Sequence, residues 1–257
     1  MLTFKNTNIG FILAVLLMAA LSTRYHVPVA VYIILPVLYS CILFYGSYYV
    51  GSNFFMKVLC SGDTKTRQIA ISFDDGPAAD HTAAILEVLK STRVPAIFFC
   101  IGKQVSGKAA LLKQIHDEGH IIGNHSFSHH FWFDLFSTAK MMNDLQQMSE
   151  TVYQTIGMRP KLFRPPYGVT TPNMKTVMQQ GSYTAIGWTI RSLDTVIKQE
   201  EKLLKKITDK LHPGAIVLLH DTSKTTLSVL PRFIAAARSE GYEFVRLDKL
   251  LNVAPYA

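Results

Sequence analysis

Two adjacent carboxylates lie within the motif SFDDGP, which spans residues 72–77. Asp-Gly-Pro alone is a common turn sequence, so a plain turn is the simplest interpretation. Asp74 and Asp75 follow a strand-like apolar run, however, and neighbouring carboxylates repel unless a cation or a shared proton offsets the repulsion. The pair therefore indicates a site in which one carboxylate binds a metal ion and the other acts as a general base.

A second motif, HSFSH, places His125 and His129 four residues apart. This spacing would bring both imidazoles to one side of a helical turn, where they could reach one ion. The pair alone is weak evidence, but together with Asp75 it predicts an Asp-His-His site with open positions for water and substrate. Such mixed ligands suit Zn²⁺, with Co²⁺, Ni²⁺ and Mn²⁺ as alternatives. His130 is expected to point elsewhere.

Two more polar motifs follow, RPPYG at 164–168 and LLHD at 218–221. Arg164 beside the carboxylates would keep one of them ionised and oriented. The stiff turn could aim the backbone N–H of Tyr167 at a developing oxyanion. The alternatives are a rigid turn for RPPYG and a buried structural histidine for His220.

Strand-like and helix-like segments alternate from residue 68 onward, which predicts a parallel sheet covered by helices. About seven such units in roughly 200 residues favour a barrel over an open sheet. The polar motifs follow predicted strand ends, where functional residues of such folds gather. The expected strands are 68–73, 95–100, 120–123, 162–163, 183–186, 215–219 and 243–245; the expected helices are 81–90, 108–118, 138–156, 172–180, 200–211 and 226–239.

The apolar residues are concentrated near the start of a chain that is 49% hydrophobic and 17% charged. Apolar stretches at 9–22 and 27–50 predict a transmembrane helical hairpin, with a secretory signal peptide as the alternative for the first. Positive residues near membrane spans are enriched on the cytoplasmic side. This favours a cytoplasmic catalytic domain, because that side of the hairpin carries Lys5, Lys57, Lys65 and Arg67, whereas the connection carries Arg24. If the first stretch does not span, or if the substrate is a cell-wall polymer, the domain lies outside.

The expected division is a membrane anchor at 1–57, a linker at 58–66 and a catalytic domain at 67–257. The formal net charge is +8. Its positive residues are not clustered into a basic patch laced with aromatics, which argues against a nucleic-acid partner. Attraction to membrane lipid or to an anionic glycan accounts for the charge equally well.

FDDGP, HSFSH, RPPYG and LLHD, in this order, resemble the polysaccharide deacetylase family with the NodB-homology fold, carbohydrate esterase family 4. The resemblance extends from about residue 67 to about residue 250. It implies an α/β fold, a deformed (β/α) barrel, and a metal-dependent hydrolase that removes N-acetyl or O-acetyl groups from glycans. Such an enzyme acts on carbon–nitrogen bonds other than peptide bonds when the acyl group is N-linked.

The resemblance also implies a role for each residue of the motifs. The metal ligands would be Asp75, His125 and His129. Asp74 would be the catalytic base, oriented by Arg164, and His220 the general acid, tuned by Asp194. The backbone of Tyr167 would stabilise the oxyanion, and the side chains that would line the substrate pocket are Leu218, Trp188 and Tyr167.

One segment, from Trp188 to Thr195, departs from the family pattern. Arg191 stands where the family often has an Asp, and Thr195 where it often has a Trp, so the substrate wall is altered. Three hypotheses therefore remain: deacetylation of a peptidoglycan, chitin-like or exopolysaccharide glycan; deacylation or deformylation of a lipid-linked amino sugar at the membrane; and an inactive glycan-binding domain.

Overall fold

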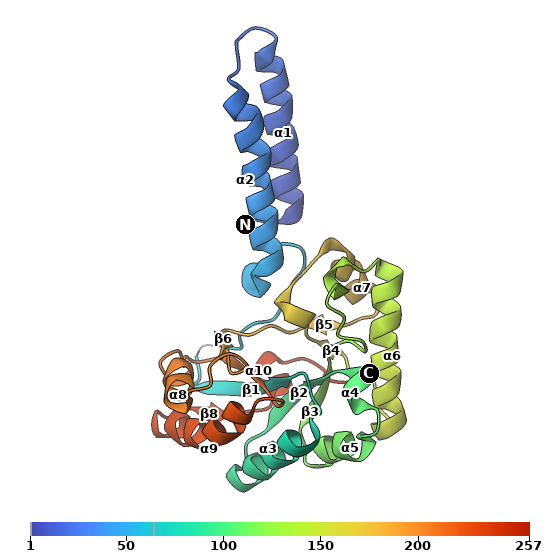
Figure 1. Cartoon of the computed structure of the whole chain (residues 1–257), viewed down its shortest axis with the longest axis vertical. Helices are drawn as coiled ribbons and strands as arrows, with labels where there is room; N and C mark the ends of the chain where they lie inside the picture. Colours follow the sequence, from blue (N-terminus) through green and yellow to red (C-terminus); the bar gives the residue numbers. More distant parts are fainter. Residues whose placement is uncertain (1, 64) are drawn as a thin grey trace.

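The computed structural model describes residues 2–63 and 65–257. It contains an N-terminal helical hairpin and an α/β domain from which the hairpin projects (Figure 1). The predicted anchor at 1–57 and the predicted linker at 58–66 each include one residue, Met1 and Thr64, that lies outside the described residues.

Two apolar helices form the hairpin, α1 (Phe4–Ser22) and α2 (Val29–Tyr48). The first is longer than the predicted stretch at 9–22, because Thr3 caps it and the polar residues after Phe4 continue the helix. The second is shorter than 27–50, since it begins after Pro28 and ends at Tyr48. With 19 and 20 residues and mean hydropathies of 1.6 and 2.1, they fit a membrane span or a signal sequence.

Contacts between the two helices align them antiparallel. The rings of Phe11 and Tyr39 stack with centroids 4.2 Å apart, and the Tyr39 hydroxyl donates to Oδ1 of Asn8 at 2.8 Å. Almost all of the apolar surface of the hairpin is exposed. In the most apolar 18-residue segment of each helix, the buried share is 0% for α1 and 6% for α2. The hairpin therefore presents its apolar side chains outward.

The end of the hairpin is packed against the α/β domain. Gly46 lies so close to Phe54 that a Cβ atom there would be 2.2 Å from the ring. After the 3₁₀ helix η1 (Val50–Ser52), Met56 and Val58 are buried with Val50 in a core cluster of the domain. The hairpin is thus joined to the domain by a packed junction.

An eight-stranded sheet forms the centre of the domain, with the order β5-β4-β3-β2-β1-β7-β6 and β8 beside β1. All strand pairs are parallel. Among the described residues no pairing joins β5 to β6, so the barrel is open on one side. This confirms the predicted deformed (β/α) barrel. The strands are β1 (Gln68–Asp74), β2 (Ala96–Cys100), β3 (Ile121–Asn124), β4 (Leu162–Phe163), β5 (Thr184–Ala185), β6 (Ile190–Arg191), β7 (Ile216–His220) and β8 (Glu243–Phe244).

Helices pack around this sheet, as the alternating pattern predicts (Figure 1). Of these, the helices of nine or more residues match the predicted segments to within three residues at either end. Two short helices, α4 and α10, and the short strand β6 give no periodic signal and were not predicted. The helix bounds are α3 (Ala79–Thr92), α4 (Gly102–Val105), α5 (Ala109–Asp117), α6 (Thr138–Ile156), α7 (Pro172–Gln180), α8 (Glu200–Thr208), α9 (Lys224–Ser239) and α10 (Leu247–Leu251), with 3₁₀ turns η2 (Phe133–Leu135) and η3 (Pro166–Gly168).

Candidate active site

The site is built at the carboxyl ends of the central strands. Asp74 is the last residue of β1 and lies in register with His220, the last residue of β7. The third strand, β3, ends at Asn124, directly before His125. Because parallel strands end at the same edge of a sheet, three motifs far apart in the sequence meet there.

The three predicted metal ligands lie together. Nε2 of His125 is 3.5 Å from Oδ1 of Asp75, and Nε2 of His129 is 3.4 Å from the same oxygen. One ligand atom from each residue lies within 4.8 Å of the others. The structure therefore brings the predicted Asp-His-His group together, as a possible metal-binding group.

The two histidines are not placed by a helical turn, and that part of the prediction was wrong. Residues 125–129 form a loop in which Ser126 and His129 have left-handed φ angles of 67° and 43°. Two side chains hold the loop by accepting hydrogen bonds from its backbone. The N–H of Ser126 donates to Oδ1 of Asn124 at 2.9 Å, and the N–H of Phe127 donates to Oδ1 of Asp144 at 2.7 Å. A four-residue spacing thus serves the same purpose on an irregular backbone.

The donor set fits a divalent cation. Nδ1 of His125 lies 2.8 Å from the Arg164 carbonyl oxygen, which can only accept, so Nδ1 carries the proton and Nε2 presents a lone pair. Oδ1 of Asp75 is buried and has no hydrogen-bond partner among the described residues. Lone pairs that face one another in this way repel unless a cation lies between them. Zn²⁺, Co²⁺, Ni²⁺ and Mn²⁺ all suit this mixture of ligands.

The charge states of Asp75 and His129 agree with metal binding. Burial alone would raise the pKa of Asp75, but the neighbouring imidazoles, first that of His125, lower it to about 2. Burial, followed by the charge of His125, lowers the pKa of His129 to about 4. An ionised carboxylate and a neutral imidazole are the forms that ligate metals. His125 differs, because the charge of Asp74 and contact with Asp75 outweigh burial and raise its pKa.

Arg164 lies beneath the site and orients Asp74. Its side chain is fully buried, and Nη1 donates to Oδ1 of Asp74 at 2.8 Å and to Oγ of Ser72 at 2.7 Å. Nη2 donates to the Gly187 carbonyl at 2.8 Å. A buried guanidinium with these partners keeps the Asp74 carboxylate in one orientation. The predicted neighbourhood of Arg164 and Asp74 is therefore present, with Ser72 as an additional partner.

His220 is held on the opposite side of the site by Asp194. Nδ1 of His220 lies 2.7 Å from Oδ1 of Asp194, and the backbone N–H of His220 donates to Oδ2 at 2.7 Å. Because a carboxylate only accepts, Nδ1 carries a proton and Nε2 is directed into the pocket, 3.9 Å from Oδ2 of Asp75. Burial alone would lower the pKa of His220, but Asp194 raises it to about 9.

These side chains open into a cavity of about 340 Å³. The predicted substrate residues Tyr167, Trp188 and Leu218 line it, as do Arg191 and Thr195 from the segment that departs from the family pattern. The left-handed φ of 74° at Gly168, and a hypothetical Cβ 2.5 Å from the Trp188 ring, explain why a glycine follows Tyr167. The predicted site residues thus lie around this cavity or, for Arg164 and Asp194, are hydrogen-bonded to residues that line it. The strand that precedes Asp194, β6, was not predicted.

Sequence reasoning missed the residues that support this site. Asp221, adjacent to His220, is fully buried beneath it, and its Oδ2 accepts a hydrogen bond from Thr82 at 2.5 Å. Burial raises the pKa of Asp221 to about 7. Thr226 donates a hydrogen bond to Asp194. Asp144 accepts one from the loop that carries the two histidines, and Ser72 accepts one from Arg164. Asp221 was visible in LLHD and Ser72 in SFDDGP, whereas Asp144 and Thr226 stand alone in the sequence, with no motif to indicate them.

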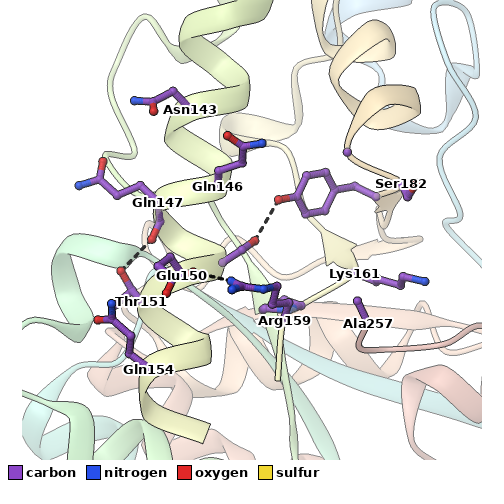
Figure 2. Close-up of a pocket in the computed structure, with 14 residues that line it drawn as sticks. Asn143, Gln146, Gln147, Glu150, Thr151, Gln154, Arg159, Lys161, Ser182 and Ala257 are labelled. Carbon is purple, nitrogen blue, oxygen red and sulfur yellow. Dashed lines mark hydrogen bonds and ion pairs between the residues drawn. The ribbon is translucent and has the colours of Figure 1, made fainter. Parts of the chain in front are cut away.

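A larger open cavity, of about 1160 Å³, lies along α6 and near the C-terminal end of the chain (Figure 2). Its lining is mainly amide and hydroxyl groups, with an ion pair of 2.6 Å between Arg159 and Glu150. The Ser149 and Tyr183 hydroxyl groups, 2.9 Å apart, are hydrogen-bonded to one another in its lining. The Asp75 group is not part of its lining, so the smaller cavity is the candidate active site.

The chain is similar to known proteins in both sequence and fold. A family model described as polysaccharide deacetylase matches residues 61–186. The peptidoglycan-N-acetylglucosamine deacetylase PgdA of Listeria monocytogenes is 34% identical over 184 residues, which are 72% of this chain and 39% of that protein. The chain thus spans about two fifths of the length of that relative. The peptidoglycan-N-acetylmuramic acid deacetylase PdaA of Bacillus subtilis is 34% identical over 194 residues, 74% of this chain and 73% of that protein.

A solved structure has the same fold. The Bc1960 peptidoglycan N-acetylglucosamine deacetylase superposes with a TM-score of 0.75 at 25% sequence identity. The superposition covers 78% of this chain and 95% of that one. The two proteins therefore share one fold over most of each chain.

Proposed function

This chain belongs to the polysaccharide deacetylase family, and on that premise we propose that it is a metal-dependent hydrolase that removes N-acetyl groups from the amino sugars of peptidoglycan. One observation carries the proposal: the Asp75, His125 and His129 group shares one cavity with Asp74 and His220. A base, an acid and a possible metal-binding group around one space are what amide hydrolysis requires. The relatives named for peptidoglycan deacetylation supply the substrate class.

A divalent ion held by Asp75, His125 and His129 would supply Lewis-acid activation of water and of the acyl carbonyl oxygen. Asp74, oriented by its hydrogen bond from Arg164, accepts a proton from the attacking water as the new carbon–oxygen bond forms. The backbone N–H of Tyr167, at the pocket wall, is our candidate donor to the oxyanion.

His220 completes the reaction by donating the Nε2 proton to the departing amine as the carbon–nitrogen bond breaks, so that acetate and a free amino sugar are released. Asp194 keeps the ring in the orientation that presents Nε2 to the pocket. Leu218 and Trp188 would contact the acyl group and the sugar, respectively. Arg191 in the same wall is a cation that an anionic muramic-acid or peptide carboxylate could contact.

The test is release of acetate and of new free amines from peptidoglycan and from N-acetylated glucosamine oligosaccharides by the full-length chain in detergent. Asp74→Asn should lower the rate by about 10²–10⁴-fold, the usual contribution of a general base. Asp80→Asn, which changes an exposed carboxylate in the first turn of α3, is the matched control and should retain the rate. Full activity in Asp74→Asn would refute the proposal, and acetate release without new amines would indicate an O-deacetylase.

A second candidate is deacylation of a lipid-linked amino sugar. It is favoured by one contact: the backbone N–H of Thr170 donates to the Ser47 carbonyl of α2 at 3.1 Å. The loop that carries Tyr167 is therefore attached to the end of the hairpin. Reporter fusions after Lys57 and at the C-terminus distinguish the two candidates, because a cytoplasmic domain could meet lipid-linked precursors but not the external polymer. The charge distribution around the hairpin favours the cytoplasmic side.

A further inference from the structure

We propose that the loop from His130 to Phe136, called the interface loop below, is a second membrane contact that holds the mouth of the catalytic pocket against the lipid–water interface. The inference rests on the predicted insertion of the hairpin in a membrane. It deepens the proposed function, because it places the amino sugar of the substrate at the membrane surface.

The interface loop exposes large apolar side chains. Phe131, Trp132 and Leu135 are 67%, 56% and 68% exposed. The rings of Phe131 and Trp132 are 4.6 Å apart and form one apolar surface. Three such side chains within five residues form a patch of the kind that marks an interaction site, whereas single exposed apolar residues are common.

The other side chains of the loop attach it to the junction below the hairpin. Phe133 and Phe136 are buried in the core cluster that contains Val50 and Met56, the residues that follow α2. The Phe136 carbonyl also accepts a hydrogen bond from Nδ2 of Asn173, in α7, at 3.0 Å. Phe131, Trp132 and Leu135 are therefore exposed on a loop that is itself firmly packed.

The interface loop lies on the side of the domain from which the hairpin projects. In Figure 1 the hairpin leaves the domain near α7, and α7 shares a core cluster with Phe133 and Phe136. The domain end of α2 also carries exposed aromatic side chains, with Tyr45, Tyr48 and Tyr49 at least half exposed. Tyrosine and tryptophan rings are enriched at the level of lipid headgroups, so the loop would extend the aromatic belt of α2.

Positive charges surround the same junction. Lys5, Lys57 and Lys175 line one cavity of about 540 Å³ at the base of the hairpin. The ammonium group of Lys140 lies 3.8 Å from the centre of the Phe136 ring. Although Asp134 lies within the loop, this lysine-rich junction matches the negative headgroups of an anionic bilayer.

The interface loop is continuous with the active site. The ring centroid of Phe131, in the loop, is 6.2 Å from that of Tyr167. The Tyr167 centroid is in turn 4.9 Å from that of His129. A bilayer in contact with Phe131 would therefore lie beside the mouth of the pocket. An amino sugar held at the membrane surface could reach His220 and Asp74 without leaving the interface.

Tryptophan fluorescence tests the inference, because Trp132 and Trp188 are the two tryptophans of the chain. The full-length chain is reconstituted in vesicles of phosphatidylglycerol and phosphatidylcholine whose acyl chains are brominated near the headgroup. In Trp188→Phe, Trp132 should lose most of its emission in brominated vesicles relative to ordinary ones. If Trp188→Phe does not fold, the emission of Trp132 is obtained by subtracting the emission of the Trp132→Phe variant from that of the wild-type chain.

Two further variants refine the test. Phe131→Ser should reduce quenching of Trp132, whereas Val196→Ser, which removes an exposed apolar side chain outside the loop, should not. Equal emission of Trp132 in brominated and ordinary vesicles, in protein that floats with the vesicles, would overturn the inference. Flotation tests insertion of the hairpin, acetate release tests the proposed function, and quenching tests the membrane contact of the interface loop. Each of the three can therefore be refuted without the other two.

Discussion

Asp194 holds His220 through two hydrogen bonds, one from Nδ1 of the ring and one from the backbone N–H, both 2.7 Å long. The two bonds fix the tautomer and the position of the ring at once, because the carboxylate can only accept. Asp194 itself is fully buried and accepts further hydrogen bonds from Ser192 and Thr226. The candidate acid is therefore a preorganised unit that is complete before a substrate arrives.

Asp194→Asn should weaken this unit in a pH-dependent way. An acid acts in its protonated form, and the pKa of His220 is about 9 with Asp194 present. Without the carboxylate charge that pKa falls, so the alkaline limb of the rate profile should move to lower pH. Measured pH–rate profiles of the two proteins test this; an unchanged alkaline limb in the variant would show that Asp194 has only a structural role.

Arg164→Met should destabilise the protein by about 3–5 kcal/mol, because it leaves Asp74 buried without its cation. The matched control is Arg159→Met, which breaks an exposed pair with Glu150 and should change stability by about 0–1 kcal/mol. Urea unfolding in detergent measures both. Similar losses for the two variants would contradict the role given to burial.

Chelation should abolish acetate release, and added Zn²⁺ should restore it, if Asp75, His125 and His129 bind the metal. His129→Ala should lose bound metal in elemental analysis. His130→Ala is the control, because this neighbouring histidine is exposed and its Nδ1 accepts the Trp132 N–H instead. Equal metal content in the two variants would exclude His129 as a ligand.

Much of this site is predictable from the sequence, because its chemistry is carried by short motifs at strand ends. The strand before Asp74 is a continuous apolar run, and α6 coincides with the predicted segment at 138–156. The order of motifs along the chain then identifies which loops meet at one edge of the sheet.

The remaining features depend on contacts between distant residues. His125 and His129 converge through a loop whose left-handed residues are held by Asn124 and Asp144, and four-residue spacing alone cannot distinguish that loop from a helix. The contact of Thr170 with Ser47 joins residues more than a hundred positions apart. No local pattern encodes such a pairing.

Gly168→Ala should impair substrate binding beyond its backbone strain. An alanine at a left-handed φ costs roughly 1–2 kcal/mol, and Gly157→Ala, with a φ of 72° and open space around it, measures that cost alone. At Gly168 the new methyl group would also meet Trp188. Displacement of that ring should lower kcat/KM by about 10²-fold. Equal activity of the two variants would refute a positioning role for Gly168.

Gly46→Ala should loosen the packed junction between α2 and the α/β domain. Alanine normally stabilises a helix by about 0.5–1 kcal/mol relative to glycine, which is the result expected for Gly10→Ala, because nothing lies within 4 Å of a Cβ there. At Gly46 the new methyl group would lie 2.2 Å from the Phe54 ring, so the effect should reverse to a loss of about 1–3 kcal/mol.

The Gly46 carbonyl also accepts a hydrogen bond from the Thr170 hydroxyl at 3.3 Å, so a shifted α2 should disturb the loop that carries Tyr167. Thermal unfolding in detergent, limited proteolysis between residues 49 and 60, and kcat together measure the change. We expect faster cleavage and a lower kcat in Gly46→Ala, with Gly10→Ala unchanged in both. If Gly46→Ala is cleaved faster but keeps its kcat, the junction anchors the domain without positioning the active site.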